Sequence, residues 1–176
     1  DISTGGAKEN FSYLLNNIDE DYDYIMFCDQ DDVWLEYRID ISLNKMIEVE
    51  GSNPLKPVLI HTNLQVVDAN LNLISGSFFT YQKIKPEWSK EFDISLVQNS
   101  VTGCAMMINK KAKEISLPIG VNAIMHDWWI LLKVLQNKGV VEYLTDTTIL
   151  YRQHTLNDTG AKGFSWLVLI KKITSF

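Results

Sequence analysis

Four apolar residues recur at helical spacing near the start of the chain: Phe11, Leu14, Leu15 and Ile18. This spacing predicts a helix over residues 7–17. The apolar run over residues 24–28 does not alternate with polar residues, which is typical of a strand buried on both faces. A second set at helical spacing consists of Ile39, Leu43, Met46 and Ile47. These residues predict the apolar face of a helix that ends at Gly51.

The middle of the chain predicts further strands. Residues 58–61 and 64–67 have the pattern of two strand segments with a break between them. Residues 101–108 predict another strand, with Gly103 inside it. A glycine within a strand indicates a bulge or the close approach of a ligand, although simple packing explains it equally well.

Alternation of strands and helices continues toward the C-terminal end. Asn109 is expected to cap a short helix that ends near Pro118. A clear helical pattern covers residues 128–137, and two short strands are predicted over 140–143 and 147–151. Because strands and helices alternate along the chain, the sequence predicts an α/β domain.

Composition limits the functional classes. The chain of 176 residues has the size of one domain, and its 16 Lys and Arg against 22 Asp and Glu give a net charge of −6. This balance argues against nucleic-acid binding through a strongly basic face. The two cysteines, Cys28 and Cys104, lie in apolar runs, and we expect both to be reduced core residues.

The sequence contains no apolar stretch long enough to span a bilayer, which favours a cytoplasmic location. Residues 163–176 predict a helix with one apolar face and with Lys171 and Lys172 exposed. This helix either packs onto the domain or makes a peripheral contact with the inner face of the cell membrane.

The most prominent polar feature is an acidic cluster directly after the first predicted strand. Asp29, Asp31 and Asp32 place three carboxylates within four residues. Such carboxylates repel one another unless a cation or ligand neutralises them, and hard oxygen ligands suit Mg²⁺ or Mn²⁺ together with phosphate oxygens. The carboxyl end of a strand is also where open α/β sheets bind ligands. The alternative is a solvated acidic turn that caps the next helix.

Two further polar segments carry candidate chemistry. Asp127 opens a helix within the sequence His-Asp-Trp-Trp, where it could serve as a general base for a hydroxyl nucleophile. An acidic residue in the first turn of a helix is also favoured by the helix dipole alone. His154 ends a predicted strand and enters a polar loop, so it could complete a metal site or be purely structural.

These motifs, in this order, resemble family 2 glycosyltransferases, particularly the bacterial rhamnosyltransferase-like group. The segments that carry the resemblance are residues 10–15, 27–34, 102–105, 126–129 and 151–154. The resemblance implies a GT-A fold, that is, a mixed sheet flanked by helices. It also implies inverting transfer of a sugar such as rhamnose from a nucleotide-diphosphate sugar to a glycan or lipid-linked acceptor during cell-surface polysaccharide synthesis.

The resemblance also implies roles for individual residues. Asp29 would lie near the ribose or diphosphate, Asp31 would bind the Mg²⁺ or Mn²⁺ ion, and Asp32 would assist them. Asp127 matches the base that deprotonates the acceptor hydroxyl, and His154 matches a residue that reaches the metal or diphosphate. Residues expected to shape the donor-sugar and acceptor pocket are Trp34, Asn99, Thr102, Gly103 and Trp128. This assignment requires Asp31 and Asp127 to face a common cleft.

Members of this family begin with a nucleobase-binding strand and loop that do not precede Asp1 in this sequence. We therefore expect one N-terminally truncated catalytic domain over residues 1–176. Residues 1–57 would be the remainder of the nucleotide-binding half, 58–162 the acceptor-binding half and 163–176 a terminal helix. The fragment is expected to bind donor weakly and turn over poorly, and a bare sheet edge would favour self-association into a homo-oligomer.

Two other functional classes fit parts of the sequence. Residues 29–33 resemble the Asp-X-Asp motif of haloacid-dehalogenase-type phosphatases, but the later acidic pair of that class is not found. A carbohydrate-binding or partner-binding remnant without enzymatic activity would use the aromatic residues Trp34, Trp88, Trp128 and Trp129.

Overall fold

A single mixed β-sheet forms the centre of the computed structural model, which describes residues 5–18 and 21–154 of the chain. Its strands are β1 (Tyr24–Met26), β2 (Val33–Trp34), β3 (Val58–Val67), β4 (Leu73–Ser75), β5 (Met106–Asn109) and β6 (Val140–Arg152). Their spatial order is β1-β5-β3-β6-β2, with β4 paired to β3. The β3–β6 pair is parallel and the others are antiparallel. The predicted α/β class is confirmed.

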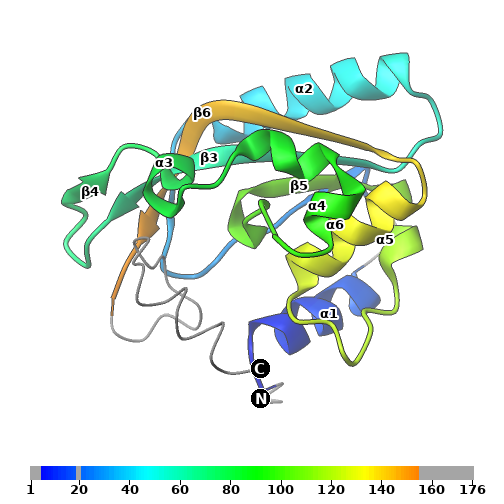
Figure 1. The fold of residues 1–176 in the computed structure, drawn as a ribbon, viewed down its shortest axis with the longest axis horizontal. Coiled ribbons are helices and arrows are strands. Elements are labelled where there is room, and N and C mark those ends of the chain that lie inside the picture. The colour runs from blue at the N-terminus through cyan, green and yellow to red at the C-terminus, as the bar shows by residue number, and fades with distance from the viewer. Residues whose placement is uncertain (1–4, 19–20, 155–176) are drawn as a thin grey trace.

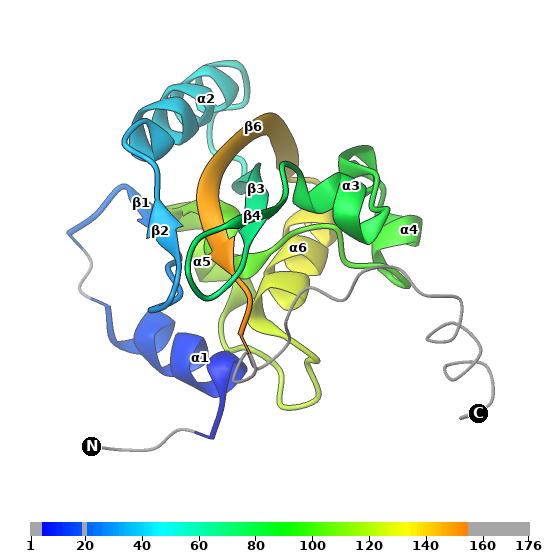
Figure 2. The same ribbon diagram turned by 90° about the vertical axis from the view of Figure 1, so that its left-hand side faces the viewer.

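Helices cover both faces of the sheet. The α-helices are α1 (Ala7–Asn17), α2 (Arg38–Ser52), α3 (Phe78–Gln82), α4 (Phe92–Ser95), α5 (Lys110–Ser116) and α6 (His126–Gln136). Two short 3₁₀ helices are η1 (Pro86–Lys90) and η2 (Gly103–Ala105). Figure 1 shows α2 above the sheet and α1, α5 and α6 below it. Figure 2 shows how strongly β6 curls as it crosses the molecule.

The core lies in two layers because neighbouring side chains on a strand point to opposite faces. On β3, Val58 and Ile60 pack with Met46 of α2 on one face. Leu59, between them in sequence, packs with Ile130 of α6 on the other face. Burial on both faces explains why the first residues of β3, Val58, Leu59 and Ile60, form a continuous apolar run without alternation.

Several elements agree with the sequence predictions. Helix α1 covers Ala7–Asn17, as expected from its apolar spacing. Asn109 caps α5, and its side chain accepts a 2.9 Å hydrogen bond from the backbone N–H of Ala112. The structure describes no residues beyond His154, so the predicted helix over 163–176 lies outside the described residues.

The predicted breaks within two strands are wrong. Residues 58–67 form one strand, β3, and residues 140–152 form one strand, β6. The two strands change register between Thr62 and Gln65, where Thr62 pairs with Leu144 but Asn63 pairs with Thr147. The polar residues that interrupted the apolar pattern therefore mark an irregularity within continuous pairing.

Three local predictions are corrected by the structure. Gly103 lies in the 3₁₀ turn η2, and the strand begins only at Met106. Ile39 and Ile47 of α2 are exposed, because the buried face of the helix is displaced from them. That face is formed by Arg38, Ser42, Met46 and Val49. Cys28 is exposed because the strand ends before it, whereas Cys104 is buried as expected, and both are free thiols.

The sheet joins the two segments that the sequence analysis treated as separate halves. Strands β1 and β2 precede residue 58, and they pair with β5 and β6, which follow it. Strand β1 stands at one end of the described sheet and pairs with β5 alone. Within the described part of the chain, no helix has both the length and the apolar character needed to cross a membrane.

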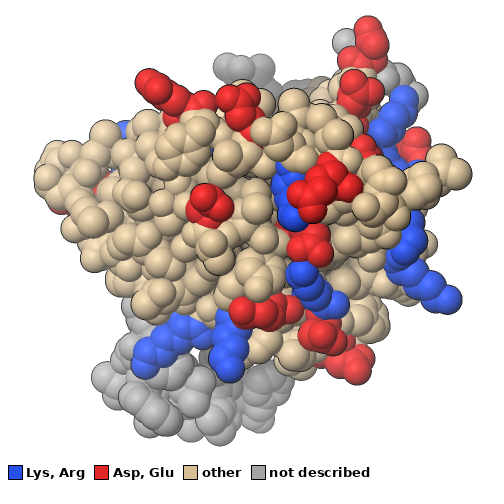
Figure 3. Space-filling view, turned by 90° about the horizontal axis from the view of Figure 1, so that it is seen from above, with Lys and Arg blue, Asp and Glu red and all other residues tan. Residues whose placement is uncertain are grey.

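Charged side chains of both signs are mixed on the face that lies over α2. Figure 3 shows acidic and basic groups interspersed there, with many of the acidic groups next to a lysine or arginine. This arrangement agrees with the overall excess of 22 acidic over 16 basic residues, and the view contains no broad basic region.

Candidate functional site

The acidic loop follows β1 and is held against the end of β6. The backbone N–H of Asp32 donates to the carbonyl of Asp29 at 3.4 Å, which closes a tight turn. Oδ1 of Asp32 accepts a 3.1 Å hydrogen bond from the backbone N–H of Arg152. The loop therefore contacts a residue far along the chain, and its three carboxylates occupy defined positions at the C-terminal ends of β1 and β6.

Asp29, Asp32 and Cys104 form a compact cluster. One possible ligand atom from each lies within 4.8 Å of the other two. Burial raises the pKa of Asp32 to about 6 and also raises that of Asp29, although hydrogen bonds with the Cys104 side chain oppose both shifts. The Cys104 thiol is buried, and this burial together with the nearby carboxylates raises its pKa well above its usual value. Cys104 therefore remains a thiol and contacts both carboxylates.

Arg38 lies beside this cluster and is fully buried at the start of α2. Its guanidinium donates to Oγ1 of Thr148 at 3.0 Å and to the carbonyl of Cys104, and it stacks 4.4 Å from the ring centre of Trp34. Burial lowers the pKa of Arg38 to about 10, so the group stays positively charged at neutral pH. Sequence reasoning missed Arg38, because an arginine in the first turn of a helix is normally exposed.

Asp31 and His154 pair directly. Oδ2 of Asp31 lies 2.7 Å from Nε2 of His154, and both side chains are partly exposed. The carboxylate comes from the loop after β1, and the imidazole follows the end of β6. The structure therefore brings together the two residues that the sequence analysis assigned to a metal.

Asp127 opens α6, and both of its carboxylate oxygens accept hydrogen bonds. Oδ2 accepts from the backbone N–H of Gly103 at 2.9 Å, and Oδ1 accepts from the backbone N–H of Trp128 at 2.6 Å and from Nδ2 of Asn99 at 3.3 Å. Burial raises the pKa of Asp127 to about 6, and the charge of Asp29 adds to this shift. Asp127 is only 9% exposed, but polar groups surround its carboxylate.

Gly103 lies between Asp127 and the cluster of Asp29, Asp32 and Cys104. Its amide holds Asp127, and the next residue, Cys104, contacts Asp29 and Asp32. A Cβ atom on Gly103 would lie 2.6 Å from Nε2 of His126, so a larger residue does not fit without a shift. The glycine that the sequence analysis singled out is thus required by close packing against His126.

The other residues expected to shape the pocket make contacts of their own with neighbouring elements. Trp128 donates from Nε1 to the carbonyl of Ser95 at 2.6 Å, which ties α6 to α4. Thr102 precedes the η2 turn, and its carbonyl accepts from the N–H of Ala105 at 2.9 Å. Trp34 packs against the small core cluster that contains Cys104, on the side of Arg38.

The chain is similar to a dTDP-rhamnosyl transferase, RfbG, from Shigella flexneri. The two sequences are 27% identical over 166 residues, which cover 89% of this chain and 52% of the relative. The chain therefore spans about half the length of this curated relative. A scan against protein-family models finds no match. The mixed sheet flanked by helices is compatible with a glycosyltransferase fold, and the distant similarity supports a relationship to glycosyltransferases.

Proposed function

We propose that this chain carries the acceptor-activating centre of a family 2 glycosyltransferase with a GT-A fold. In this proposal, a sugar passes with inversion from a nucleotide-diphosphate donor to a hydroxyl group of a saccharide or lipid-linked acceptor. The observation that carries the proposal is the placement of Asp127 beside the acidic loop, through the adjacent residues Gly103 and Cys104. The similarity to a dTDP-rhamnosyl transferase favours a rhamnose donor.

Asp127 is the proposed general base. The acceptor oxygen attacks the anomeric carbon, the bond from that carbon to the diphosphate breaks, and the hydroxyl proton passes to the Asp127 carboxylate. A carboxylate whose pKa is raised to about 6 remains ionised at neutral pH and is a stronger base than an ordinary aspartate. The hydrogen bonds from Gly103 and Asn99 fix the orientation of this carboxylate.

Asp31 and His154 fit a divalent cation such as Mn²⁺ or Mg²⁺. Carboxylate oxygen suits both ions and imidazole nitrogen is compatible with Mn²⁺, and the two donors already lie 2.7 Å apart with partial exposure. When bound, such an ion offsets the charge that develops on a leaving diphosphate. Asp29 and Asp32 complete the polar surface toward the nucleotide, in agreement with their closeness to each other.

The remaining proposed roles concern substrate contact. Trp34, Thr102 and Gly103 would shape the donor side, and Asn99 and Trp128 would shape the acceptor side around Asp127. Because such acceptors belong to cell-surface polysaccharide synthesis, the proposed place of action is the cytoplasmic face of the membrane.

Calorimetric titration of the full chain with dTDP and Mn²⁺ tests the proposal, followed by transfer assays with dTDP-rhamnose. We expect weak nucleotide binding that requires Mn²⁺ and is lost in Asp31→Asn. The matched control is Asp93→Asn, which neutralises an exposed aspartate on α4, outside the site. Failure of dTDP to bind, and of UDP and GDP when they are titrated in the same way, would contradict the proposed function. Equal binding by both variants would also contradict it.

A further inference from the structure

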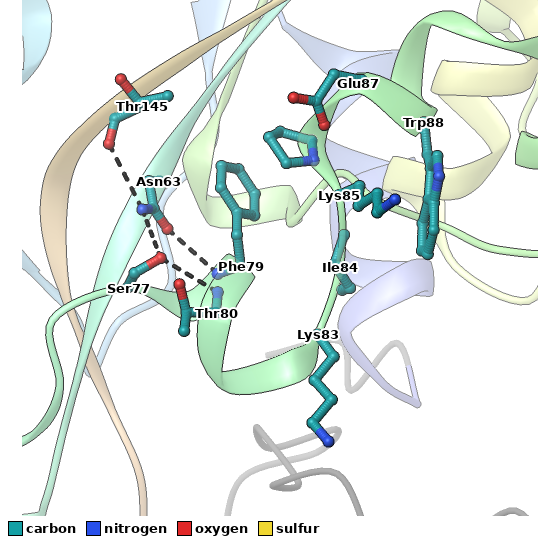
Figure 4. A pocket seen from close by; sticks show the side chains of 11 residues that line it. Asn63, Ser77, Phe79, Thr80, Lys83, Ile84, Lys85, Glu87, Trp88 and Thr145 are labelled. Atoms are coloured by element: carbon teal, nitrogen blue, oxygen red, sulfur yellow. Dashed lines mark hydrogen bonds between the residues drawn. The ribbon is translucent and has the colours of Figure 1, made fainter.

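A hollow lies apart from the acidic loop, between α3, η1 and the curled part of the sheet (Figure 4). Figure 4 shows this pocket, whose volume is about 950 Å³. That volume lies at the upper end of the range of roughly 300–1,000 Å³ that is typical of small-ligand sites. The pocket shares no residue with the acidic loop or with the surroundings of Asp127.

An irregularity of the sheet shapes one side of this pocket. Thr145 lies in β6 where two residues have no partner in β3, because Thr62 pairs with Leu144 and Asn63 with Thr147. Asn63 bridges the irregularity by donating from Nδ2 to Oγ of Ser77 at 2.9 Å and to the carbonyl of Thr145 at 3.5 Å. β-Bulges in general are over-represented at sheet edges and next to active sites.

The opposite side is shaped by the end of α3 and by η1. Helix α3 stops at Lys83, whose φ of 55° reverses the chain, and the N–H of Ile84 donates to the carbonyl of Phe79 at 2.9 Å. The chain then enters η1, which places Trp88 on the pocket wall, where its side chain is partly exposed. The pocket therefore has a defined backbone frame on both sides.

The lining combines apolar rings with hydroxyl, amide and charged groups. Its apolar members are Phe79, Ile84, Pro86 and Trp88. Exposed polar groups around them include Thr80, Lys85 and Glu87. A sugar ring presents C–H groups on its faces and hydroxyls at its edge, so it matches an aromatic wall with polar groups beside it. The charged members of the lining are Lys83, Lys85 and Glu87, so ammonium and carboxylate groups are both available to hydroxyl groups of a ligand.

Hydrogen bonds tie the wall of the pocket to the helix that carries Asp127. The carbonyl of Trp88 accepts from Oγ of Ser95 at 3.2 Å, and the carbonyl of Ser95 accepts from Nε1 of Trp128 at 2.6 Å. Trp128 directly follows Asp127 in the sequence. The pocket is therefore held in a fixed position relative to the residue proposed to activate the acceptor.

We infer that this pocket, centred on Trp88, binds a sugar unit of the acceptor saccharide that does not itself react. That the bound sugar belongs to an acceptor rests on the proposed function. Binding of a saccharide in this pocket does not depend on that function. A remote subsite of this kind would select acceptors by a neighbouring sugar and would orient the reacting hydroxyl toward Asp127.

Direct binding tests the inference. The full chain is applied to an array of oligosaccharides of rhamnose, glucose, galactose and N-acetylglucosamine, and the best ligand is titrated by isothermal calorimetry. We expect Trp88→Ala to weaken binding by about tenfold or more and Trp88→Phe to retain most of the affinity, because the stacking face persists. Phe92→Ala, which removes an exposed ring on α4 outside the pocket, should leave affinity unchanged.

Glu87→Gln provides a second variant at an exposed position, and its amide oxygen can still accept the 3.3 Å hydrogen bond from the Tyr143 hydroxyl. It should also weaken binding measurably. Titration of Trp88→Ala with dTDP and Mn²⁺ should match the parent chain, because the nucleotide would bind elsewhere. Absence of saccharide binding to the parent chain, or unchanged binding in both Trp88→Ala and Glu87→Gln, would overturn the inference. Trp88-dependent saccharide binding without nucleotide binding would support the subsite and contradict the transferase proposal.

Discussion

The backbone N–H of Gly103 donates a 2.9 Å hydrogen bond to Oδ2 of Asp127. The same glycine lies so close to His126 that a Cβ atom would stand 2.6 Å from Nε2 of that ring. The ring cannot easily move, because its centre lies 4.3 Å from that of Phe11 and 5.5 Å from that of Phe27. Absence of a side chain at residue 103 thus lets the η2 turn approach α6 and position the carboxylate.

Gly103→Ala is expected to destabilise the protein through this contact. Forcing a methyl group into a packed region costs about 1–3 kcal/mol, and here the nearest atoms belong to a buried ring. We expect a lower free energy of unfolding by urea denaturation. Gly51→Ala is the matched control, because the residue is in a helix and its added Cβ would meet no atom within 4 Å beyond the adjacent residues and the backbone of its own helix. It should be neutral or stabilising.

A double-mutant cycle identifies the cause of that loss. His126→Ala removes the ring and makes room for a methyl group at residue 103. The combined variant should therefore be more stable than the sum of the two single losses predicts, by about 1 kcal/mol or more. Additive losses would show that the contact between Gly103 and His126 is not responsible.

His126 predicts a pH-dependent stability. The residue is buried, and no described residue offers a hydrogen-bond partner to either ring nitrogen. Burial lowers the pKa of His126 from 6.5 to about 4. Between pH 4 and pH 6.5, this histidine is therefore protonated in the unfolded chain but neutral in the folded chain. Stability is therefore lost as the pH falls from 6.5 toward 4. His126→Phe should remove this part of the loss.

The expected difference is measurable by chemical denaturation. The change in free energy of unfolding caused by His126→Phe should be more favourable at pH 5 than at pH 7.5 by about 2 kcal/mol. This difference follows from the two pKa values of His126 through the linkage relation. Any change in packing from the larger ring shifts both measurements equally and cancels. His61, whose pKa burial lowers to about 3, remains in both proteins and produces the same trend in each. Parallel pH profiles for parent and variant would contradict the prediction.

Local patterns in the sequence predicted those elements whose boundaries are marked by nearby residues. The apolar spacing around Phe11 gave the bounds of α1, and Asn109 identified the start of α5. Polar residues within β3 were interpreted as a break, because the sequence does not reveal that Asn63 is satisfied by Ser77 and Thr145. Because these distant residues satisfy the hydrogen-bonding groups of the Asn63 side chain, the strand continues through this polar position.

The candidate site shows the same limit. The sequence identified Asp29, Asp32 and Asp127 as candidate site residues. The structure places them around the η2 turn, which contains Gly103 and Cys104. Arg38 could not be identified, because its burial depends on Thr148 and on the carbonyl of Cys104. Nothing in the local sequence distinguishes it from an exposed helical arginine.

Asp127 predicts the pH dependence of the proposed transfer. Burial raises its pKa to about 6, and the base must be ionised to accept a proton. With dTDP-rhamnose as donor, kcat/KM should therefore rise as the pH increases through about 6 and then level off. Asp127→Asn should lower the rate by about 10²–10⁴-fold while leaving nucleotide binding intact. A rate that is unchanged in this variant, with a thermal midpoint equal to that of the parent, would exclude Asp127 as the base.

Asp31 and His154 predict a metal-binding defect that requires no measurement of activity. If the two residues hold Mn²⁺, Asp31→Asn and His154→Gln should each weaken Mn²⁺ binding by about tenfold or more, because each variant removes one ligand. Electron paramagnetic resonance of free Mn²⁺ in the presence of the chain measures this affinity directly. Asp40→Asn, an exposed aspartate in the first turn of α2, is the matched control for loss of one negative charge. Equal weakening in all three variants would indicate general electrostatic attraction, and unchanged affinity in Asp31→Asn would place the ion elsewhere.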